Sequence, residues 1–315
     1  MSIIEKAASR IDQQRQAAVP ANPGQAERDA VIAGENAAVP AVTQAIAAAQ
    51  PGDATPMAME TATQPAPAGS PRPATRKVEL DLARMRELGM VTAAGGRTNL
   101  LEEFRVIKRP LLKRAFAERA PQKNPGNLIM ITSSLPGEGK TYSSINLAMS
   151  IAMELDHTVL LVDADVARPS VMRTLGLPAQ RGLMDILVDD SLDVSDVLLR
   201  TNVETLAILP AGTSTPHATE LLASSAMTSL VGELANRYPD RVIIFDSPPL
   251  LLTSESRELA SHMGQIVVVV EAQTTTQHAV KEALQRLEGF DNVNLIYNKT
   301  RDLPGIEETY DYHYG

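Results

Sequence analysis

Six apolar segments that alternate with helix-like segments restrict the fold of this 315-residue chain more than any other feature. Most of them are apolar at consecutive positions, which is typical of strands that are covered on both faces in a parallel sheet. Segments with helical periodicity separate them. The alternation predicts an α/β domain with a doubly wound, mostly parallel sheet between helix layers. The expected strands lie at 128–133, 158–165, 204–212, 241–249, 265–272 and 292–299, and the expected helices at 140–155, 219–237, 256–262 and 276–287.

A glycine-rich loop joins the first strand to its helix in the segment ITSSLPGEGKT, residues 131–141. Its glycines let the backbone turn so that several N–H groups point at one anion, and the helix adds its positive N-terminal end. A lysine in this place reaches the β and γ phosphate oxygens, and the hydroxyl after it binds magnesium. Ser134 stands where the P-loop pattern has its first glycine, and serine is small enough to keep the loop. We therefore expect ATP and Mg2+ as ligands, with ATP bound by Pro136, Gly137, Glu138, Gly139, Lys140, Thr141 and Tyr142.

Three aspartates stand where buried strands are expected to end. VLLVDADVARP supplies Asp163 and Asp165, and VIIFDSPPL supplies Asp246. Ligands of open α/β sheets bind at the carboxyl ends of the strands, so these carboxylates are expected beside the phosphates. Asp246 fits a residue that holds a magnesium-bound water, although a turn or N-cap aspartate has the same pattern. Asp163 is the best candidate for polarising an acceptor hydroxyl.

These residues make up an expected reaction centre. The expected catalytic residues are Lys140, Asp163, Asp165 and Asp246, and the expected metal-binding residues are Thr141, Asp163 and Asp246. Arg168 follows at a distance that suits a nucleotide or acidic contact, but a surface arginine is equally compatible with the pattern.

Composition excludes several other classes of protein. The net charge of -9 and the pI of about 5.2 argue against a nucleic-acid binder, which would carry a basic surplus. The absence of cysteine removes disulfides and thiolate metal sites, and it fits a reducing cytoplasm. No apolar stretch is long enough to span a bilayer, and the N-terminus has no signal-peptide pattern. We expect a cytoplasmic protein, and any link to a membrane must come through a partner.

The rest of the chain divides by composition. Residues 1–17 predict a short amphipathic helix, for which a frayed tail is the alternative, and the Ala/Pro-rich residues 18–77 predict a disordered linker. Residues 78–126 predict a helical lead-in, with helices at Val78–Met90 and from Asn99 onward, the second kinked or broken at Pro110. The nucleotide-binding domain is expected at 127–302 and a tyrosine-rich tail at 303–315.

The combination of S-x-x-P-G-E-G-K-T, D-x-D-x-x-R and D-S-P-P resembles the bacterial tyrosine kinases (BY-kinases) of polysaccharide export, from about Leu101 to the end. Within that family, EEFRVIKRPLL before the P-loop is most similar to the autokinases of exosortase (PEP-CTERM) loci. The resemblance implies a P-loop NTPase fold of the SIMIBI type, with Walker A, A′ and B motifs. It also implies assembly into a ring through an E-x-x-R-x-x-R helix, here Glu102, Arg105 and Lys108. For Asn298 it implies a contact with adenine, although a turn asparagine fits the sequence equally well.

Three of the six tyrosines lie in the last six residues, at Tyr310, Tyr312 and Tyr314, with Asp311 and His313 between them and two glutamates just before. A terminal edge strand is one explanation. The resemblance implies another, in which a neighbouring subunit of a homo-oligomeric ring phosphorylates this cluster. It further implies a membrane partner, a chain-length-determinant (polysaccharide co-polymerase) protein.

We therefore expect an ATP-dependent protein-tyrosine autokinase that regulates exopolysaccharide synthesis and export. One alternative is a dimerisation-switch ATPase of the cell-division and plasmid-partition type. Those proteins usually carry a second lysine early in the loop, where this chain has Ser133, Ser134 and Leu135. A nucleotide-binding scaffold without activity is a third interpretation, which ATP turnover or phosphotyrosine would exclude.

Overall fold

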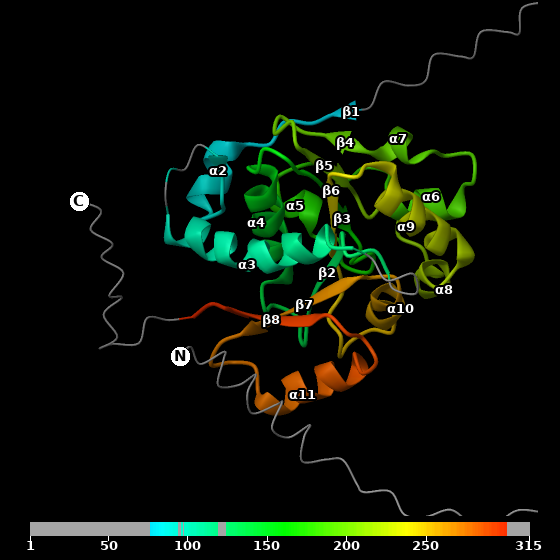
Figure 1. Cartoon of the computed structure of the whole chain (residues 1–315). Coiled ribbons are helices and arrows are strands. Elements are labelled where there is room, and N and C mark those ends of the chain that lie inside the picture. The colour runs from blue at the N-terminus through cyan, green and yellow to red at the C-terminus, as the bar shows by residue number, and fades with distance from the viewer. Residues whose placement is uncertain (1–75, 94–95, 97, 119–123, 301–315) are drawn as a thin grey trace, which may run out of the picture. The chain divides into compact units, whose positions relative to one another are not determined.

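The computed structural model describes residues 76–93, 96, 98–118 and 124–300, all of which belong to one compact unit of the chain. The expected N-terminal helix, nearly all of the expected linker and the tyrosine tail lie outside the described residues. The core is an eight-stranded sheet with the order β1-β4-β5-β3-β6-β2-β7-β8 (Figure 1). Neighbouring strands are parallel except for the antiparallel pair β4 and β5. The strands are β1 (Arg76–Lys77), β2 (Leu128–Ser133), β3 (Thr158–Asp163), β4 (Leu199–Arg200), β5 (Leu206–Leu209), β6 (Arg241–Asp246), β7 (Gln265–Glu271) and β8 (Val293–Asn298).

All six expected strands are present, which confirms the mostly parallel α/β fold. β2 has the expected bounds, and the other five strands are shorter than expected. β3 ends at Asp163, so Asp165 lies in the loop beyond it. The two-residue strands β1 and β4 were not expected, because pairs this short leave no pattern in a sequence.

Helices cover both faces of the sheet, and each face has its own apolar cluster. Alternate residues of the central strands point to opposite sides. In β2, Leu128 and Met130 join one cluster, whereas Ile129 and Ile131 join the other. The first cluster packs under α6 (Leu183–Val188), α7 (Val194–Val197), α8 (Ala218–Leu222), α9 (Ser225–Arg237), α10 (Glu255–Ser261) and α11 (Gln277–Arg286). The second packs under α2 (Leu82–Glu87), α3 (Asn99–Ala115), α4 (Lys140–Ala152) and α5 (Val171–Thr174).

Two expected helices are shorter or divided. The helix expected at Val78–Met90 covers only Leu82–Glu87. Asp81 is its N-cap, and the Asp81 carboxylate accepts from the backbone N–H of Arg84 at 2.9 Å. The helix expected at 219–237 is divided into α8 and α9. Ser224 separates them, because its hydroxyl accepts from Met227 N at 3.2 Å and so caps a new helix.

The break expected at Pro110 is absent, since α3 runs without interruption from Asn99 to Ala115. Pro110 and Val106, whose carbonyl loses its helical partner to the proline, both lie on the exposed face of the helix. Water can serve that carbonyl there. The opposite face, with Phe104 and Leu111, is buried and holds the helix against the domain. Among the described residues, no helix has the length and the apolar character that a membrane span requires.

Candidate active site

The P-loop connects β2 to α4 at the carboxyl edge of the sheet. Gly137 and Gly139 adopt φ of +86° and +98°, the left-handed conformation that glycine reaches without a steric cost. Gly139 is also the N-cap of α4, so the positive end of that helix opens where the loop closes. The loop therefore has the geometry of an anion cradle, as the sequence predicted.

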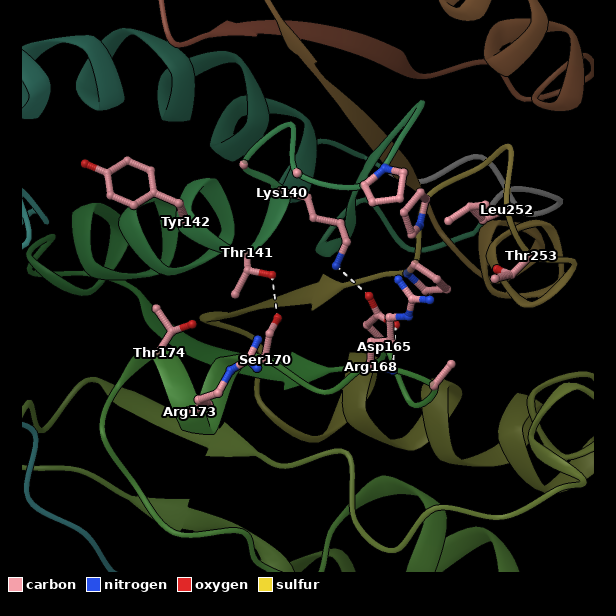
Figure 2. A pocket seen from close by; sticks show the side chains of 16 residues that line it. Lys140, Thr141, Tyr142, Asp165, Arg168, Ser170, Arg173, Thr174, Leu252 and Thr253 are labelled. Carbon is pink, nitrogen blue, oxygen red and sulfur yellow. Dashed lines mark hydrogen bonds and ion pairs between the residues drawn. The ribbon is translucent and has the colours of Figure 1, made fainter. Parts of the chain in front are cut away.

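Lys140, the first residue of α4, forms an ion pair with Asp165. Its Nζ atom lies 2.6 Å from Asp165 Oδ2, and both side chains are largely buried, at 11% and 6% exposed (Figure 2). Asp165 is held in turn by the backbone N–H of Arg168, 3.2 Å from Oδ1. The sequence predicted that both residues belong to the site, and the structure adds that they hold each other.

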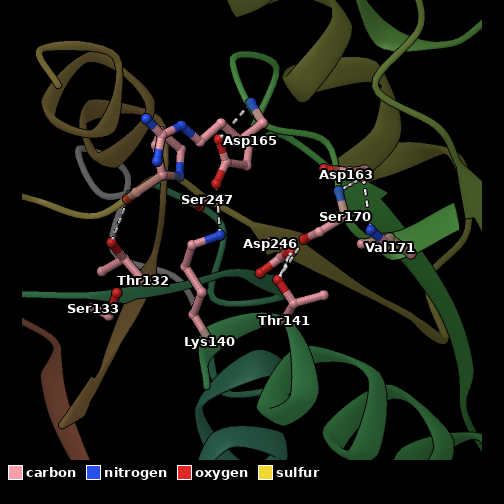
Figure 3. A network of polar contacts seen from close by, with 12 residues as sticks. Thr132, Ser133, Lys140, Thr141, Asp163, Asp165, Ser170, Val171, Asp246 and Ser247 are labelled. Atoms are coloured by element: carbon pink, nitrogen blue, oxygen red, sulfur yellow. Dashed lines mark hydrogen bonds and ion pairs between the residues drawn. The ribbon is translucent and has the colours of Figure 1, made fainter. Parts of the chain in front are cut away.

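Asp246, at the end of β6, is fully buried and surrounded by hydroxyl groups. Thr141 donates to its Oδ2 at 2.7 Å (Figure 3). The hydroxyl of Ser144 lies 3.1 Å from its Oδ1. Ser170 lies 2.7 Å from the Thr141 hydroxyl, and since Thr141 donates to Asp246, Ser170 donates to Thr141. Burial raises the pKa of Asp246, and Lys140 and these hydrogen bonds partly oppose that rise.

Asp163 faces Asp246 across the β3–β6 pairing and is also fully buried. Its Oδ2 accepts from the backbone N–H groups of Ser170 and Val171, each at 3.0 Å (Figure 3). Its Oδ1 has no hydrogen-bond partner among the described residues. Burial, followed by the charge of Asp246, raises the pKa of Asp163 from 3.8 to about 7. A carboxyl with this pKa exchanges protons near neutral pH, as a general base requires.

A pocket of about 560 Å³ opens in front of these groups (Figure 2). Of the residues expected beyond the second strand, Asp165 and Arg168 line the pocket. Asp163 and Asp246 are fully buried and lie beneath its wall. The two prolines of the D-S-P-P motif also line it. The loop and helix residues that line it are Pro136, Gly137, Gly139, Lys140, Thr141 and Tyr142, and further lining residues are Ala167, Ser170, Arg173, Thr174, Pro248, Pro249, Leu252 and Thr253.

Glu138 and Asn298 do not line this pocket, although the sequence predicted an ATP contact for both. The carboxylate of Glu138 is buried under the loop and accepts from Leu135 N at 2.6 Å and from the hydroxyl of Thr275. Asn298 Nδ2 donates to the backbone carbonyl of Glu138 at 2.8 Å. Both side chains are thus engaged with the loop itself.

Tyr142 lines the pocket, but its hydroxyl is used elsewhere. It donates to the carbonyl of Gly89 at 2.5 Å, which ties the segment after α2 to α4. Burial raises the pKa of this phenol. Sequence reasoning missed Ser144 and Ser170. Ser144 had a signal, because it lies three positions after Thr141 and therefore on the same helix face.

The expected oligomerisation residues are divided by the structure. Glu102 and Arg105 pair with each other at 2.5 Å on the accessible side of α3. The Lys108 ammonium donates to Ser150 O at 2.6 Å and pairs with Glu154, whose pKa it lowers mainly through their hydrogen bond. The Lys108 side chain is only 5% exposed. This burial argues against the expected contact between Lys108 and a second subunit, because its charge is already satisfied within the chain.

The side-chain atoms of Asp163, Asp246 and Thr141 that could bind a metal suit magnesium, which prefers oxygen ligands. They are all oxygen atoms, and Asp163 Oδ1 accepts no hydrogen bond from any residue that the structure describes. Among the described residues there is no group of three or more acidic, His or Cys side chains that could hold a metal without other ligands. A metal here therefore needs phosphate oxygens and water as well, which is the usual arrangement for magnesium with a nucleotide.

Fold and site together define a P-loop nucleotide-binding protein, and residues 126–300 match the family model described as "AAA domain". The putative tyrosine-protein kinase CapB of Staphylococcus aureus is 28% identical over 222 residues, which are 70% of this chain and 92% of CapB. The tyrosine-protein kinase YwqD of Bacillus subtilis (strain 168) is 33% identical over 154 residues, which are 49% of this chain and 63% of YwqD.

Solved structures agree with these relatives. The kinase domain of the Escherichia coli tyrosine kinase ETK matches with a TM-score of 0.57 and 28% identity, over 68% of this chain and 81% of that domain. The VpsO kinase domain matches with a TM-score of 0.53 and 30% identity, over 64% of this chain and 96% of that domain. The chain belongs to the family of bacterial tyrosine-protein kinases.

Proposed function

We propose that this chain is an ATP-dependent autokinase that phosphorylates tyrosines of its own C-terminal cluster, Tyr310, Tyr312 and Tyr314. The observation that carries the proposal is the contact of the P-loop Lys140 with the pocket carboxylate Asp165, near the buried Asp163 and Asp246. We also propose that it belongs to the exosortase (PEP-CTERM) subgroup, on the strength of EEFRVIKRPLL before the P-loop.

The first step is an exchange of partners at Lys140. A nucleotide in the cradle brings phosphate oxygens to the N–H groups of the loop and to the Lys140 ammonium. Lys140 then leaves Asp165, and the Asp165 carboxylate becomes available to an incoming group. Arg168 and Arg173, which line the same pocket, add positive charge where the phosphates and the transferred group lie.

The tyrosine oxygen then attacks the γ-phosphorus. The bond between the tyrosine oxygen and phosphorus forms while the bond from phosphorus to the β-γ bridging oxygen breaks, so that ADP leaves with that electron pair. The phenolic proton passes to a carboxylate. Asp163 has the pKa for this role, and Asp165 is the carboxylate that the pocket exposes. Magnesium, when bound with the nucleotide, supplies charge neutralisation, and Thr141 with Asp246 are the residues to hold it.

Glu102 and Arg105 on the accessible side of α3 are the proposed contacts of a homo-oligomeric ring, in which one subunit's tail enters a neighbour's pocket. We propose a separate membrane chain-length-determinant (polysaccharide co-polymerase) protein as the partner that assembles the ring. The chain would then act at the cytoplasmic side of the inner membrane and regulate exopolysaccharide synthesis and export.

The test is intact-protein mass spectrometry after incubation with ATP and magnesium. Wild type should gain one phosphate mass for each modified tyrosine, and Lys140→Met should gain none. Lys281→Met, an exposed lysine of α11, is the matched control and should behave as wild type. Equal phosphorylation of Lys140→Met and wild type contradicts the proposal. ATP hydrolysis without phosphotyrosine supports the dimerisation-switch ATPase instead.

Transfer between subunits needs a mixing experiment. One chain carries Lys140→Met with an intact tail, and the other carries an intact P-loop with all three tail tyrosines changed to phenylalanine. Neither chain alone should become phosphorylated on the tail. Phosphate on the Lys140→Met chain after mixing supports transfer in trans, and its absence, with wild type active in parallel, contradicts it.

A further inference from the structure

The end of β8 lies against the outside of the P-loop. Strands β2, β7 and β8 are neighbours and parallel, so their carboxyl ends meet at one edge of the sheet. The P-loop leaves β2 at that edge. Asn298, the last residue of β8, donates to the carbonyl of Glu138 at 2.8 Å, and Lys299 Nζ donates to the carbonyl of Gly137 at 2.8 Å. Two consecutive loop carbonyls are thus held from one side.

Holding these carbonyls also fixes the direction of two N–H groups. In a planar trans peptide the C=O and the N–H point in opposite directions. The Gly137 carbonyl shares its peptide with the N–H of Glu138, and the Glu138 carbonyl shares its peptide with the N–H of Gly139. When Lys299 and Asn298 hold the two carbonyls on the β8 side, both N–H groups face away from β8, into the cradle.

The glycine at position 139 leaves room for the side chain of Asn298. A Cβ added to Gly139 would lie 2.0 Å from Asn298 Nδ2, so the side chain of Asn298 occupies the space that any larger residue at 139 would need. Lys299 has φ of +57°, a left-handed conformation that is sterically unfavourable for a residue with a Cβ. Its ammonium is also paired with Glu271, at the end of β7, at 2.9 Å. The strained turn is therefore held by contacts at both strand ends.

We propose that Asn298 and Lys299 are positioning residues for phosphate binding. They hold the peptides that join Gly137 to Glu138 and Glu138 to Gly139, so that the N–H groups of Glu138 and Gly139 point at the nucleotide phosphates. This rests on the proposed use of ATP at the same P-loop. It assigns Asn298 a task that involves the phosphates and not the adenine. The buried carboxylate of Glu138, bonded to Leu135 N and Thr275, anchors the same loop from below.

Two ligands distinguish a role of Asn298 in phosphate binding from a contact with adenine. ADP binds through base and phosphates, whereas inorganic pyrophosphate occupies the cradle without any base. The experiment measures the affinity of both probes by calorimetry in excess magnesium, for wild type, Asn298→Ala and Lys299→Met. The exposed Asn236→Ala on α9 and Lys281→Met on α11 are the matched controls. Lys299→Arg keeps a donor at the same place, and urea unfolding reports whether each variant is folded.

We expect Asn298→Ala and Lys299→Met to weaken ADP and pyrophosphate by equal factors of about five to ten, as the loss of one loop-ordering hydrogen bond predicts. Lys299→Arg should recover most of that loss, and the controls should match wild type. Weaker ADP with unchanged pyrophosphate for Asn298→Ala means an adenine contact and overturns the proposal. Unchanged affinity for both probes overturns it as well. Failure of wild type to bind either probe refutes the proposed function instead.

Discussion

Replacing Asp163 by asparagine should make the nucleotide-free protein more stable at neutral pH. Asparagine keeps the shape of the side chain, and its oxygen can still accept from the N–H groups of Ser170 and Val171. It removes a buried carboxyl that stands beside Asp246 and whose Oδ1 has no partner among the described residues. The same change should abolish tyrosine phosphorylation, so stability and activity should move in opposite directions.

The raised pKa of Asp163 determines how much stability the Asp163→Asn change should add. A rise from 3.8 to about 7 corresponds, at about 1.36 kcal/mol for each pKa unit, to an upper limit of roughly 4 kcal/mol. Below the unfolded pKa the carboxyl is protonated in both states and costs nothing. As the pH rises from about 4 to about 7, the unfolded chain loses the proton first, and folding stability falls. Between about pH 5 and about pH 7 this group should remove roughly 2 kcal/mol from the wild type.

Urea unfolding at both pH values, without nucleotide or magnesium, measures this difference. The free energy of unfolding of the wild type should fall between about pH 5 and about pH 7 by roughly 2 kcal/mol more than that of Asp163→Asn. Asp190→Asn, at an exposed position beyond α6, is the control and should keep the wild-type dependence. Parallel curves for wild type and Asp163→Asn would show that Asp163 titrates as an ordinary carboxyl, and would refute the reasoning.

Three further changes test other contacts. Gly139→Ala places a Cβ 2.0 Å from Asn298 at φ of +98°, so calorimetry should show ADP binding weakened by more than about tenfold; near wild-type binding contradicts the close contact. Lys108→Met leaves a carbonyl of α4 without its charged donor and should lower the free energy of unfolding by roughly 1–3 kcal/mol in urea; an unchanged midpoint means that the ammonium contributes nothing. Thr141→Val removes the hydroxyl bonded to Asp246, so ADP affinity should fall by about tenfold with magnesium and little with a chelator; equal losses point to a packing defect.

The sequence alone predicted those parts of the site that are made by residues close together in the chain. The P-loop, its glycines at positive φ and the helix that begins at Lys140 follow from one contiguous segment. The strands that end in Asp163 and Asp246 were also predicted, because an apolar run closed by a carboxylate is a local pattern. Parallel strands then bring these carboxylates to the same edge of the sheet.

The contacts that the sequence did not predict all join segments that are distant in the chain. The sequence predicted a nucleotide contact for Glu138, but it did not predict that the Glu138 carboxylate lies beneath the loop, where Thr275 donates to it. Lys108 was expected at an oligomer contact, yet its side chain is buried, because α4 supplies the Ser150 carbonyl and Glu154 beyond the end of α4 supplies a carboxylate. Each outcome depends on a partner that no local spacing reveals.

The ion pair between Lys140 and Asp165 has a consequence for turnover. The Asp165 carboxylate and a nucleotide phosphate compete for the Lys140 ammonium. A nucleotide that binds must therefore displace Asp165 from Lys140. That competition lowers affinity, but it also speeds departure, because the lysine returns to Asp165 as ADP leaves. In the proposed autokinase, a subunit that modifies several tyrosines must exchange its nucleotide after each transfer, and product release often limits such cycles. The built-in anion therefore favours repeated rounds over tight binding.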